Sequence, residues 1–266
     1  MEYTVYAKKL MHEDDIIVAI WKNKRETPLE ALHRLRRERS EFKESTLSYA
    51  GRLDPLAQGV LPVLVGNQAN KNRDHYLRTD KVYELSVLFG IGTDSHDLLG
   101  VPAAFSHEIN IDKSTAESAC LSFTGTYTQK YPGYSSKTIA GKPMHTLMRE
   151  SKLSQKEIPS QEVTIYSVTI NGWEQISARL ILQEVNKFSE ITGDFRQKEI
   201  IERWHEIFKN FPEALFPVLS ITVACSSGTY MRKLAYDIGQ ILKVPALAYS
   251  ITRIQAGNFT KSDCIL

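Results

Sequence analysis

The sequence contains little cysteine and no long hydrophobic run. Its three cysteines among 266 residues lie far apart and form no C-x-x-C pair, so they indicate neither a disulfide framework nor a cysteine zinc site. No stretch of about 18 apolar residues is present, which argues against a transmembrane helix. The N-terminal segment MEYTVYAKKLMHEDD lacks the apolar core and the cleavage site of a signal peptide. We therefore expect a globular protein of the cytoplasm.

The chain also lacks a strong net charge, because its formal charge is only +2. A charge this small does not by itself indicate a nucleic-acid partner. The basic residues are nevertheless crowded in one window, and they are Lys22, Lys24, Arg25, Arg34, Arg36, Arg37 and Arg39. Such a run is typical of a solvated helix face, and a helix that contacts phosphates would have the same composition. Both interpretations stay open on this observation alone.

Motifs of common cofactor-dependent enzymes are missing as well. The sequence has no G-x-G-x-x-G fingerprint and no P-loop, and its seven histidines are scattered without the spacing of metal ligands. The sequence therefore gives no indication of a nucleotide cofactor or a bound metal.

Hydrophobic periodicity predicts a mixture of helices and strands. Thr27 followed by Pro28 and leucines at a spacing of three predict a helix over 28–39. Segments rich in β-branched and aromatic residues predict strands at 60–66, 81–93, 161–173, 178–185 and 217–225. Apolar residues at helical spacing predict helices at 112–123 and 229–243, with a weaker signal at 197–210.

The order of these elements shows no regular βαβ alternation. It therefore predicts the α+β class, with a mixed, mainly antiparallel sheet flanked by helices. No internal repeat, low-complexity tract or Pro/Gly linker interrupts the chain, so we expect a single domain over residues 1–266.

Residues 45–71 hold the densest cluster of unusual residues. Gly51 and Pro55 punctuate a loop ahead of an apolar strand, and Asp54 lies inside that loop. An aspartate before a proline is most often part of an Asx-type turn, in which its carboxylate bonds the local backbone. Taken alone, the loop does not establish a catalytic carboxylate.

Five segments in a fixed order strengthen the interpretation of this loop. The first is GRLDPLAQGVLPV (51–63). The others are KVYELSVLFGIGTDSHDLLG (81–100), QKYPGYSSKTIAGKP (129–143), CSSGTYMRKLAYDIG (225–239) and ITRIQAGNFT (251–260). Together they resemble the TruB-type pseudouridine synthases, whose signature loop carries a catalytic aspartate, and this residue falls on Asp54.

The resemblance implies the pseudouridine synthase catalytic fold with a central active-site cleft. It also implies isomerisation of a uridine in tRNA, with uridine 55 of the T-loop as the expected target. The reaction breaks the bond from N1 to C1′, turns the freed base and rejoins it through C5, so it requires no redox cofactor and no metal. The family's aspartate is the nucleophile or the stabiliser of a sugar intermediate, and it must be ionised for either role.

Two further catalytic residues follow from the resemblance. The family's arginine partner of the aspartate falls on Arg232, whose guanidinium would keep the carboxylate charged and oriented. The tyrosine of the second segment falls on Tyr83, which would offer an aromatic face to the flipped-out base and a phenol for proton transfer. Without this context, a strand tyrosine is usually a core residue and a helix arginine is often a surface ion pair.

The expected substrate contacts are more numerous. Tyr230 would form a second wall of the base pocket, and Ile251 takes the family's aliphatic position on the substrate side. Lysines are natural phosphate contacts, although exposed lysines are common on any surface. The expected substrate-binding residues are Tyr49, Arg52, Lys71, Lys137, Lys142, Tyr230 and Ile251.

The sequence departs from the family pattern in two places. Tyr49 stands where the family has a histidine beside the flipped base, which affects the choice of target more than the chemistry. No C-terminal PUA domain is recognised within the 266 residues, so RNA affinity is expected to depend on the catalytic domain and its basic residues. We expect a monomer that binds tRNA and neither a metal nor a membrane.

Two other functions are compatible with the same residues. The chain could modify a different RNA, or it could be an RNA-binding or tRNA-folding chaperone with little catalysis. The joint presence of Asp54, Tyr83 and Arg232 favours an enzyme, because a chaperone has no chemical use for all three.

Overall fold

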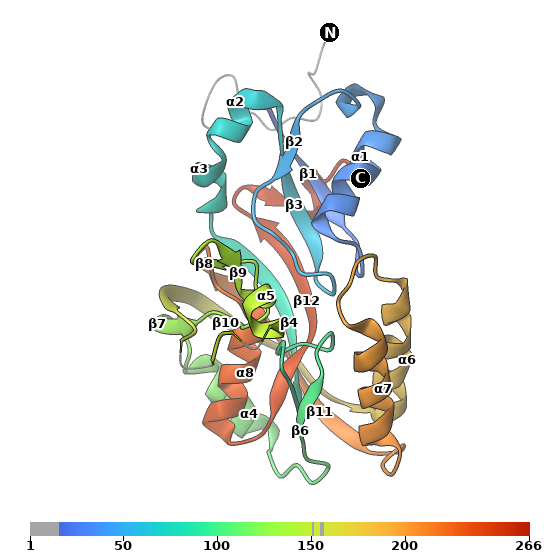
Figure 1. The fold of residues 1–266 in the computed structure, drawn as a ribbon. Helices are drawn as coiled ribbons and strands as arrows, with labels where there is room; N and C mark the ends of the chain where they lie inside the picture. The colour runs from blue at the N-terminus through green and yellow to red at the C-terminus, as the bar shows by residue number, and fades with distance from the viewer. Residues whose placement is uncertain (1–15, 151, 155–156) are drawn as a thin grey trace. The chain divides into compact units, whose positions relative to one another are not determined.

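A computed structural model describes residues 16–150, 152–154 and 157–266 (Figure 1). The absence of a signal peptide was predicted from residues 1–15, which lie outside the described residues. The helices are α1 Pro28–Glu38, α2 Gly66–Lys71, α3 Arg73–Leu77, α4 Lys113–Leu121, α5 Met144–Arg149, α6 Ala178–Asn186, α7 Gln197–Phe208 and α8 Met231–Leu242. Short 3-10 helices cover Ser40–Phe42, Lys187–Glu190 and Lys261–Asp263. Among the described residues, no helix is both long and apolar enough to cross a membrane.

The strands form one large sheet and two small hairpins. The strands are β1 Ile16–Lys22, β2 Leu47–Tyr49, β3 Gln58–Val65, β4 Lys81–Phe89, β5 Ile91–Thr93, β6 Pro102–Phe105, β7 Gly125–Lys130, β8 Thr138–Ile139, β9 Lys142–Pro143, β10 Ser160–Ser177, β11 Leu215–Cys225, β12 Ala246–Ala256 and β13 Phe259–Thr260. The pairs β1–β3, β10–β11 and β7–β10 are antiparallel, whereas β3 and β12 are parallel. This confirms the predicted α+β class with a mixed sheet.

Contacts group the chain into two compact units. The first comprises the chain up to Glu84 together with Glu190–Thr192 and Ile251–Leu266, and the second comprises Leu85–Ser189 and Gly193–Ser250. Strands β4 and β12 run through both units. The single domain and the central cleft expected from the sequence stay predictions.

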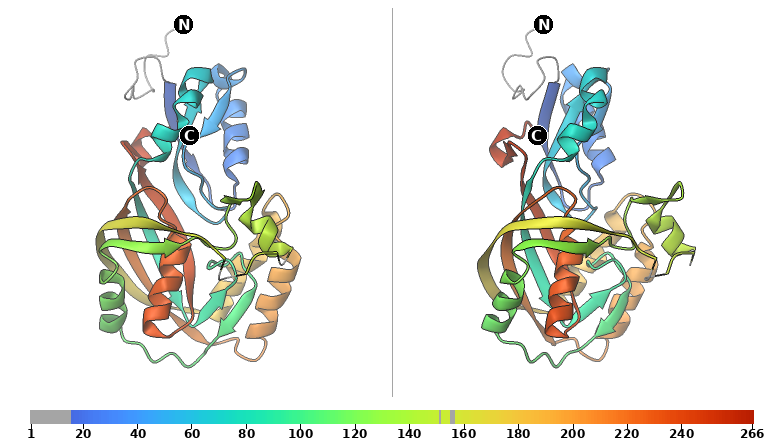
Figure 2. Two further views of the ribbon diagram at one scale, coloured as in Figure 1. Left: turned by 60° about the vertical axis from the view of Figure 1, so that its left-hand side comes forward. Right: turned by 90° about the vertical axis from the view of Figure 1, so that its left-hand side faces the viewer.

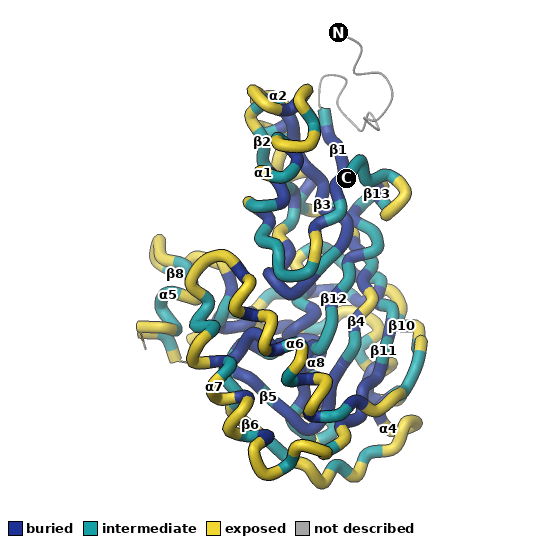
Figure 3. Tube along the Cα trace, turned by 90° about the vertical axis from the view of Figure 1, so that its right-hand side faces the viewer, coloured by how far each residue is buried: buried dark blue, intermediate teal, exposed yellow. Residues whose placement is uncertain are grey.

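In the first unit, a sheet of order β1-β3-β12 is buried on both faces, with β2 and β13 attached to it. Ile17 and Ala19 of β1 pack into one cluster, and Val18 and Ile20 pack into another cluster that includes Leu35 of α1. Every residue of β3 after Gln58 is buried, as the dark tube in Figure 3 shows. Because both faces of β1 and β3 are covered, these two strands are continuous apolar runs and not alternating patterns.

Helix α1 begins where the sequence predicts. The Thr27 side chain accepts a hydrogen bond from the backbone N–H of Glu30, and the Glu30 side chain accepts one from the Thr27 backbone N–H. This reciprocal cap satisfies donors that a helix start leaves unpaired, and Pro28 occupies the first turn, where no N–H is needed. The predicted helix over 28–39 is therefore confirmed.

In the second unit, strands follow the order β4-β11-β10-β7. Helices α4 and α8 pack against each other and against the β7–β10–β11 part of the sheet, as the views in Figure 2 show. Helices α6 and α7 also pack against each other, α6 contacts β10 and α7 contacts β6. The predicted strands at 161–173 and 217–225 and the predicted helices at 112–123, 197–210 and 229–243 are confirmed.

The strand predicted at 178–185 is wrong, because these residues form α6. The Ser177 hydroxyl caps the helix by accepting the Leu180 N–H, and the buried residues Ala178, Ile181 and Val185 follow a helical spacing. The aliphatic run ARLILQEV suggested a strand, but alanine, leucine, glutamine and glutamate are good helix formers. A serine at the first boundary was the signal that favoured a helix.

Candidate active site

Asp54 lies on the loop between β2 and β3 in the first unit. Its neighbours Leu53, Pro55 and Leu56 are buried, whereas Asp54 itself is half-buried and Arg52 is exposed. Buried apolar side chains on either side of Asp54 thus anchor the loop. The Asp54 carbonyl accepts the Ala57 N–H at 3.0 Å, which closes a tight turn directly after the carboxylate.

Two buried basic side chains, those of Lys22 and Arg253, hold the backbone of this loop. Lys22 is 0% exposed, and its Nζ donates to the Ala57 carbonyl at 2.6 Å and to the Pro55 carbonyl at 3.4 Å. Arg253 is 1% exposed and donates to the carbonyls of Gly51 at 3.0 Å and Val60 at 2.8 Å. Since these carbonyls lie on both sides of Asp54, the two basic side chains fix the backbone that carries it.

Gly59 is required where the loop enters β3. Its φ is +122°, and a Cβ atom there would lie 2.2 Å from the Arg253 carbonyl oxygen. No side chain fits at that distance, so glycine permits the close pairing of β3 with β12.

The burial of Lys22 corrects the interpretation of the basic segment. Lys22 is enclosed beneath the loop and does not face solvent, so it is no phosphate contact. Arg34 is also used internally, because it forms an ion pair with Glu26 and donates to the Trp21 carbonyl. Arg37 is exposed, so the expectation of an RNA-facing basic surface on 22–39 survives only for part of the segment.

The Lys22 side chain predicts a pH dependence of stability. Burial lowers its pKa from 10.5 to about 7, against the opposing influence of Glu26 and Asp54. Between pH 7 and pH 10.5 the unfolded chain therefore binds more protons than the folded chain, and this residue makes stability rise with pH. Relative to a Lys22→Met variant, we expect the unfolding free energy of the original protein to rise by up to about 1.4 kcal/mol per pH unit.

Urea unfolding at several pH values across this window measures the difference. Lys43, an exposed residue, provides a matched control, because Lys43→Met should keep the pH profile of the original protein. Parallel profiles for the original protein and Lys22→Met would contradict the assignment.

The other predicted residues of the first unit differ in exposure. Tyr83, on β4, is 9% exposed, and Ile251, on β12, is also buried. Tyr49 ends β2 and packs against the hydrophobic cluster that includes Leu35, so its ring is part of the core as well as of the predicted site. Lys71, at the end of α2, is exposed, as a phosphate contact requires.

Arg232 lies in the first turn of α8 in the second unit and is 3% exposed. Its Nη1 donates to the Ser95 carbonyl at 2.8 Å, and its Nη2 donates to the Tyr134 carbonyl at 3.1 Å. Its Nε lies 3.6 Å from Oδ2 of the buried Asp97. Arg232 is thus held by a carboxylate and two carbonyls of its own unit. Its pairing with Asp54 would join residues of the two units and stays a prediction.

Asp97 is the site residue that the sequence did not identify. Its Oδ1 accepts the Ser95 hydroxyl at 2.6 Å and the Leu99 N–H at 3.0 Å, which fixes the carboxylate that faces Arg232. The T-D-x-x-D pattern in residues 81–100 was visible, but it gave no indication of which aspartate binds the arginine.

His96, between the two residues that hold Arg232, stays neutral. Its ring stacks on Tyr236 with centroids 4.3 Å apart. Burial, together with the neighbouring charges of Arg232 and Lys233, lowers its pKa to about 3. A neutral imidazole does not compete with the guanidinium for the Asp97 carboxylate.

The remaining predicted residues lie near Tyr131 or at the surface of the second unit. Tyr230 is half-buried directly before α8, and its ring meets that of Tyr131 edge to face at 5.5 Å. The exposed Lys137 places its Nζ 5.2 Å from the Tyr131 ring centroid, and Lys142 is exposed on β9. The structure therefore brings Tyr230 and Lys137 to one aromatic side chain.

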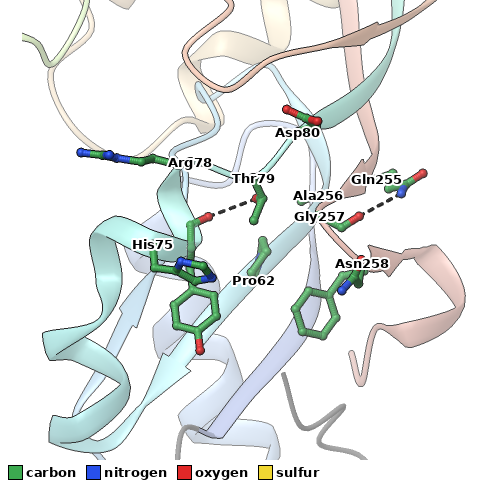
Figure 4. Close-up of a pocket in the computed structure, with 11 residues that line it drawn as sticks. Pro62, His75, Arg78, Thr79, Asp80, Gln255, Ala256, Gly257 and Asn258 are labelled. Atoms are coloured by element: carbon green, nitrogen blue, oxygen red, sulfur yellow. Dashed lines mark hydrogen bonds between the residues drawn. The ribbon is translucent and has the colours of Figure 1, made fainter. Parts of the chain in front are cut away.

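A separate pocket of about 410 Å³ lies in the first unit (Figure 4). Its lining combines apolar residues such as Pro62 and Phe259 with polar residues such as Arg78. The Thr79 hydroxyl donates to the Tyr76 carbonyl at its edge. None of the predicted site residues belongs to its described lining. Among residues 16–150, 152–154 and 157–266, no group of three or more His, Cys, Asp or Glu side chains could hold a metal ion.

Comparisons with known proteins agree on one family. Residues 39–187 match the model for the N-terminal domain of the TruB family pseudouridylate synthases. The chain is 32% identical over 219 residues to tRNA pseudouridine synthase B of Clostridium novyi (strain NT), which covers 82% of this chain and 60% of that protein. It is 30% identical over 249 residues to the protein of the same name from Clostridium perfringens (strain 13 / Type A), covering 94% and 69%.

Solved structures share the fold at low sequence identity. A chain in the crystal structure of a Cbf5-Nop10-Gar1 complex matches with a TM-score of 0.56 and 15% identity, over 92% of this chain and 50% of that chain. A chain in the structure of an H/ACA RNP bound to a substrate RNA containing 2′-deoxyuridine matches with a TM-score of 0.53 and 15% identity, over 92% and 48%. The present chain spans about 60% of the length of the Clostridium novyi relative.

Proposed function

Because this chain belongs to the TruB family of pseudouridylate synthases, we propose that it isomerises a uridine of tRNA to pseudouridine, with uridine 55 of the T-loop as its target. The observation that carries the proposal is the Asp54 loop, which has the family's signature and places the half-buried Asp54 on a backbone held by two buried basic side chains. The relatives named tRNA pseudouridine synthase B support tRNA as the substrate.

We propose that the Asp54 carboxylate reacts with or stabilises the sugar while the bond from N1 to C1′ breaks. The freed base turns and forms a bond from C5 to C1′, C5 loses its proton and N1 gains one, so the atoms of uridine are conserved. A preorganised carboxylate suits this step, because it stabilises developing positive charge without reorganisation of the site. The hydrogen bonds from Lys22 and Arg253 to the carbonyls around Asp54 supply that preorganisation in the first unit.

Tyr83 provides a test of the proton transfer. The Tyr83→Phe substitution keeps the aromatic ring and removes only the hydroxyl, so we expect tRNA affinity to stay unchanged. If the phenol moves the C5 proton, the single-turnover rate should fall by about 100-fold or more. Tyr76, which is buried in the same unit, offers a control, because Tyr76→Phe should leave the rate intact. An undiminished rate in Tyr83→Phe would remove the phenol from the mechanism.

The proposed function is tested with purified protein and an unmodified tRNA transcript, followed by carbodiimide mapping of pseudouridine at single-nucleotide resolution. A single signal at uridine 55 is the expected result. Binding of the transcript without any modification would overturn the proposal and favour a chaperone.

One observation favours a second candidate, a pseudouridine synthase that acts on another RNA. Tyr49 replaces the family's histidine beside the target base, and its ring packs on the core of the first unit. Mapping of total RNA from cells with and without the protein would show a signal that depends on the protein outside the T-loop.

A further inference from the structure

Arg196 lies directly before α7 and contacts two segments of the second unit, one at Asp94 and one at Tyr134. Its Nη1 and Nη2 donate to the two carboxylate oxygens of Asp94 at 2.8 and 3.1 Å. The same guanidinium lies over the Tyr134 ring, 4.3 Å from its centroid. A planar guanidinium can make a forked ion pair and stack on a ring at the same time, which lysine cannot.

The same two segments supply the backbone carbonyls that accept hydrogen bonds from Arg232. Tyr134, which stacks on Arg196, supplies the carbonyl that accepts from Nη2 of Arg232. Asp94 directly precedes Ser95, whose carbonyl accepts from Nη1 of Arg232. One carbonyl that accepts from Arg232 therefore belongs to Tyr134, which Arg196 contacts, and the other belongs to the residue after Asp94, which Arg196 binds.

The Asp94 carboxylate, which Arg196 binds, is also hydrogen-bonded to the backbone of its own segment. Its Oδ1 accepts the Val101 N–H at 2.9 Å, and its own N–H donates to the Val101 carbonyl at 3.1 Å. The carboxylate is thus part of a closed turn over residues 94–101, and a displacement of its oxygens would shift the Ser95 carbonyl.

The backbone of Arg196 also carries a conformational cost. Its φ is +64°, in the left-handed region that favours glycine or asparagine. Glycine would adopt this conformation with less strain, so the forked ion pair and the ring contact of the Arg196 side chain have to offset the cost.

We propose that Arg196 is a positioning residue that orients Arg232 through Asp94 and Tyr134. This rests on the proposed function, in which Arg232 belongs to the catalytic machinery. The guanidinium of Arg196 does not touch the substrate; it aligns the two carbonyls that set the direction of the Arg232 side chain.

Three substitutions separate positioning from stability. In Arg196→Gln and Arg196→Gly we expect the single-turnover rate on tRNA to fall about 10- to 100-fold, because small displacements in an active site are costly. Arg196→Lys keeps the charge without the fork and should not restore the rate. Arg196→Gly relieves the backbone strain, so its melting temperature should equal or exceed that of Arg196→Gln. In every variant, tRNA affinity should stay within about twofold.

Arg203 provides the matched control, because it lies on the same helix in an exposed ion pair with Glu206. Arg203→Gln should keep the rate of the original protein. Rates of Arg196→Gln and Arg196→Gly equal to that rate would overturn the proposal, as would rates that rise and fall with melting temperature alone.

A second measurement works without enzymatic activity. The Nε–H signal of Arg232 in a nitrogen-15 NMR spectrum, identified by its loss in Arg232→Lys, reports the environment of that guanidinium. We expect the signal to shift or broaden in Arg196→Gln and to stay unchanged in Arg203→Gln. An unmoved signal in Arg196→Gln would refute positioning. An original protein inactive on tRNA, together with a shifted signal, would refute the proposed function while supporting the link from Arg196 to Arg232.

Discussion

Replacing Asp54 by asparagine is expected to abolish pseudouridine formation while tRNA affinity stays within about tenfold of the original value. Asparagine has the size of aspartate but carries no charge, so it can neither attack the sugar nor stabilise positive charge on it. The loop should persist, because the hydrogen bonds from Lys22 and Arg253 to its backbone carbonyls stay in place after the substitution. The rate is measured by mapping a tRNA transcript under single-turnover conditions, and the affinity by filter binding.

Asp74 offers the control for this substitution, since it is an exposed aspartate of the same unit on α3. Asp74→Asn should retain the full rate. If Asp54→Asn also retained it, the nucleophile assignment would have to be abandoned. A loss of binding equal to the loss of rate would instead indicate that Asp54 serves recognition.

Local sequence signals predicted much of the fold because they depend on neighbours in the chain. The cap formed by Thr27 and Glu30 involves residues three apart, and the apolar run of β3 directly reflects burial on both faces. The segment 178–185 was misassigned because its aliphatic residues suit either a strand or a helix. The deciding group, the Ser177 hydroxyl, lies just outside the run.

Residues whose partners lie far along the chain could not be predicted. Lys22 looked like one member of a basic surface, yet its Nζ donates to two carbonyls of the Asp54 loop, more than 30 residues away, as well as to the adjacent Asn23 carbonyl. Arg196 came from a segment with balanced charge and no motif, and its partner Asp94 is about 100 residues distant. Sequence composition contains no information about such pairings, because they are created by the packing of the whole unit.

The catalytic candidates were recognisable for a different reason. Asp54, Tyr83 and Arg232 fall in segments that resemble a family, so their roles could be inferred without any geometry. Asp97 falls in one of these segments too, but its role depends on which carboxylate faces Arg232 in space, and the T-D-x-x-D pattern offers two. The structure gives each aspartate its own arginine: Asp94 pairs with Arg196 and Asp97 pairs with Arg232.

The second large effect is expected at the buried pair of Asp97 and Arg232, where one substitution should lower both stability and the reaction rate. Asp97→Asn is expected to lower the unfolding free energy by about 3–5 kcal/mol, because it removes one partner of a buried ion pair. The rate should fall as well, by about 100-fold, since the carbonyls that accept from the Nη atoms of Arg232 do not replace the carboxylate beside its Nε. Urea unfolding and single-turnover assays measure the two losses separately.

A double-mutant cycle distinguishes the structural from the catalytic part of this pair. Arg232→Met alone should destabilise the fold, because it removes the other partner of this buried pair. The double variant Asp97→Asn, Arg232→Met should be more stable than the sum of the single losses by about 1–3 kcal/mol, since the two charges of the pair are removed together. Its activity should not recover, because the guanidinium itself is missing. Recovery of the rate together with stability would show that the pair serves only the fold. The exposed pair of Glu213 and Arg179 is the control, and Glu213→Gln should change stability and rate little.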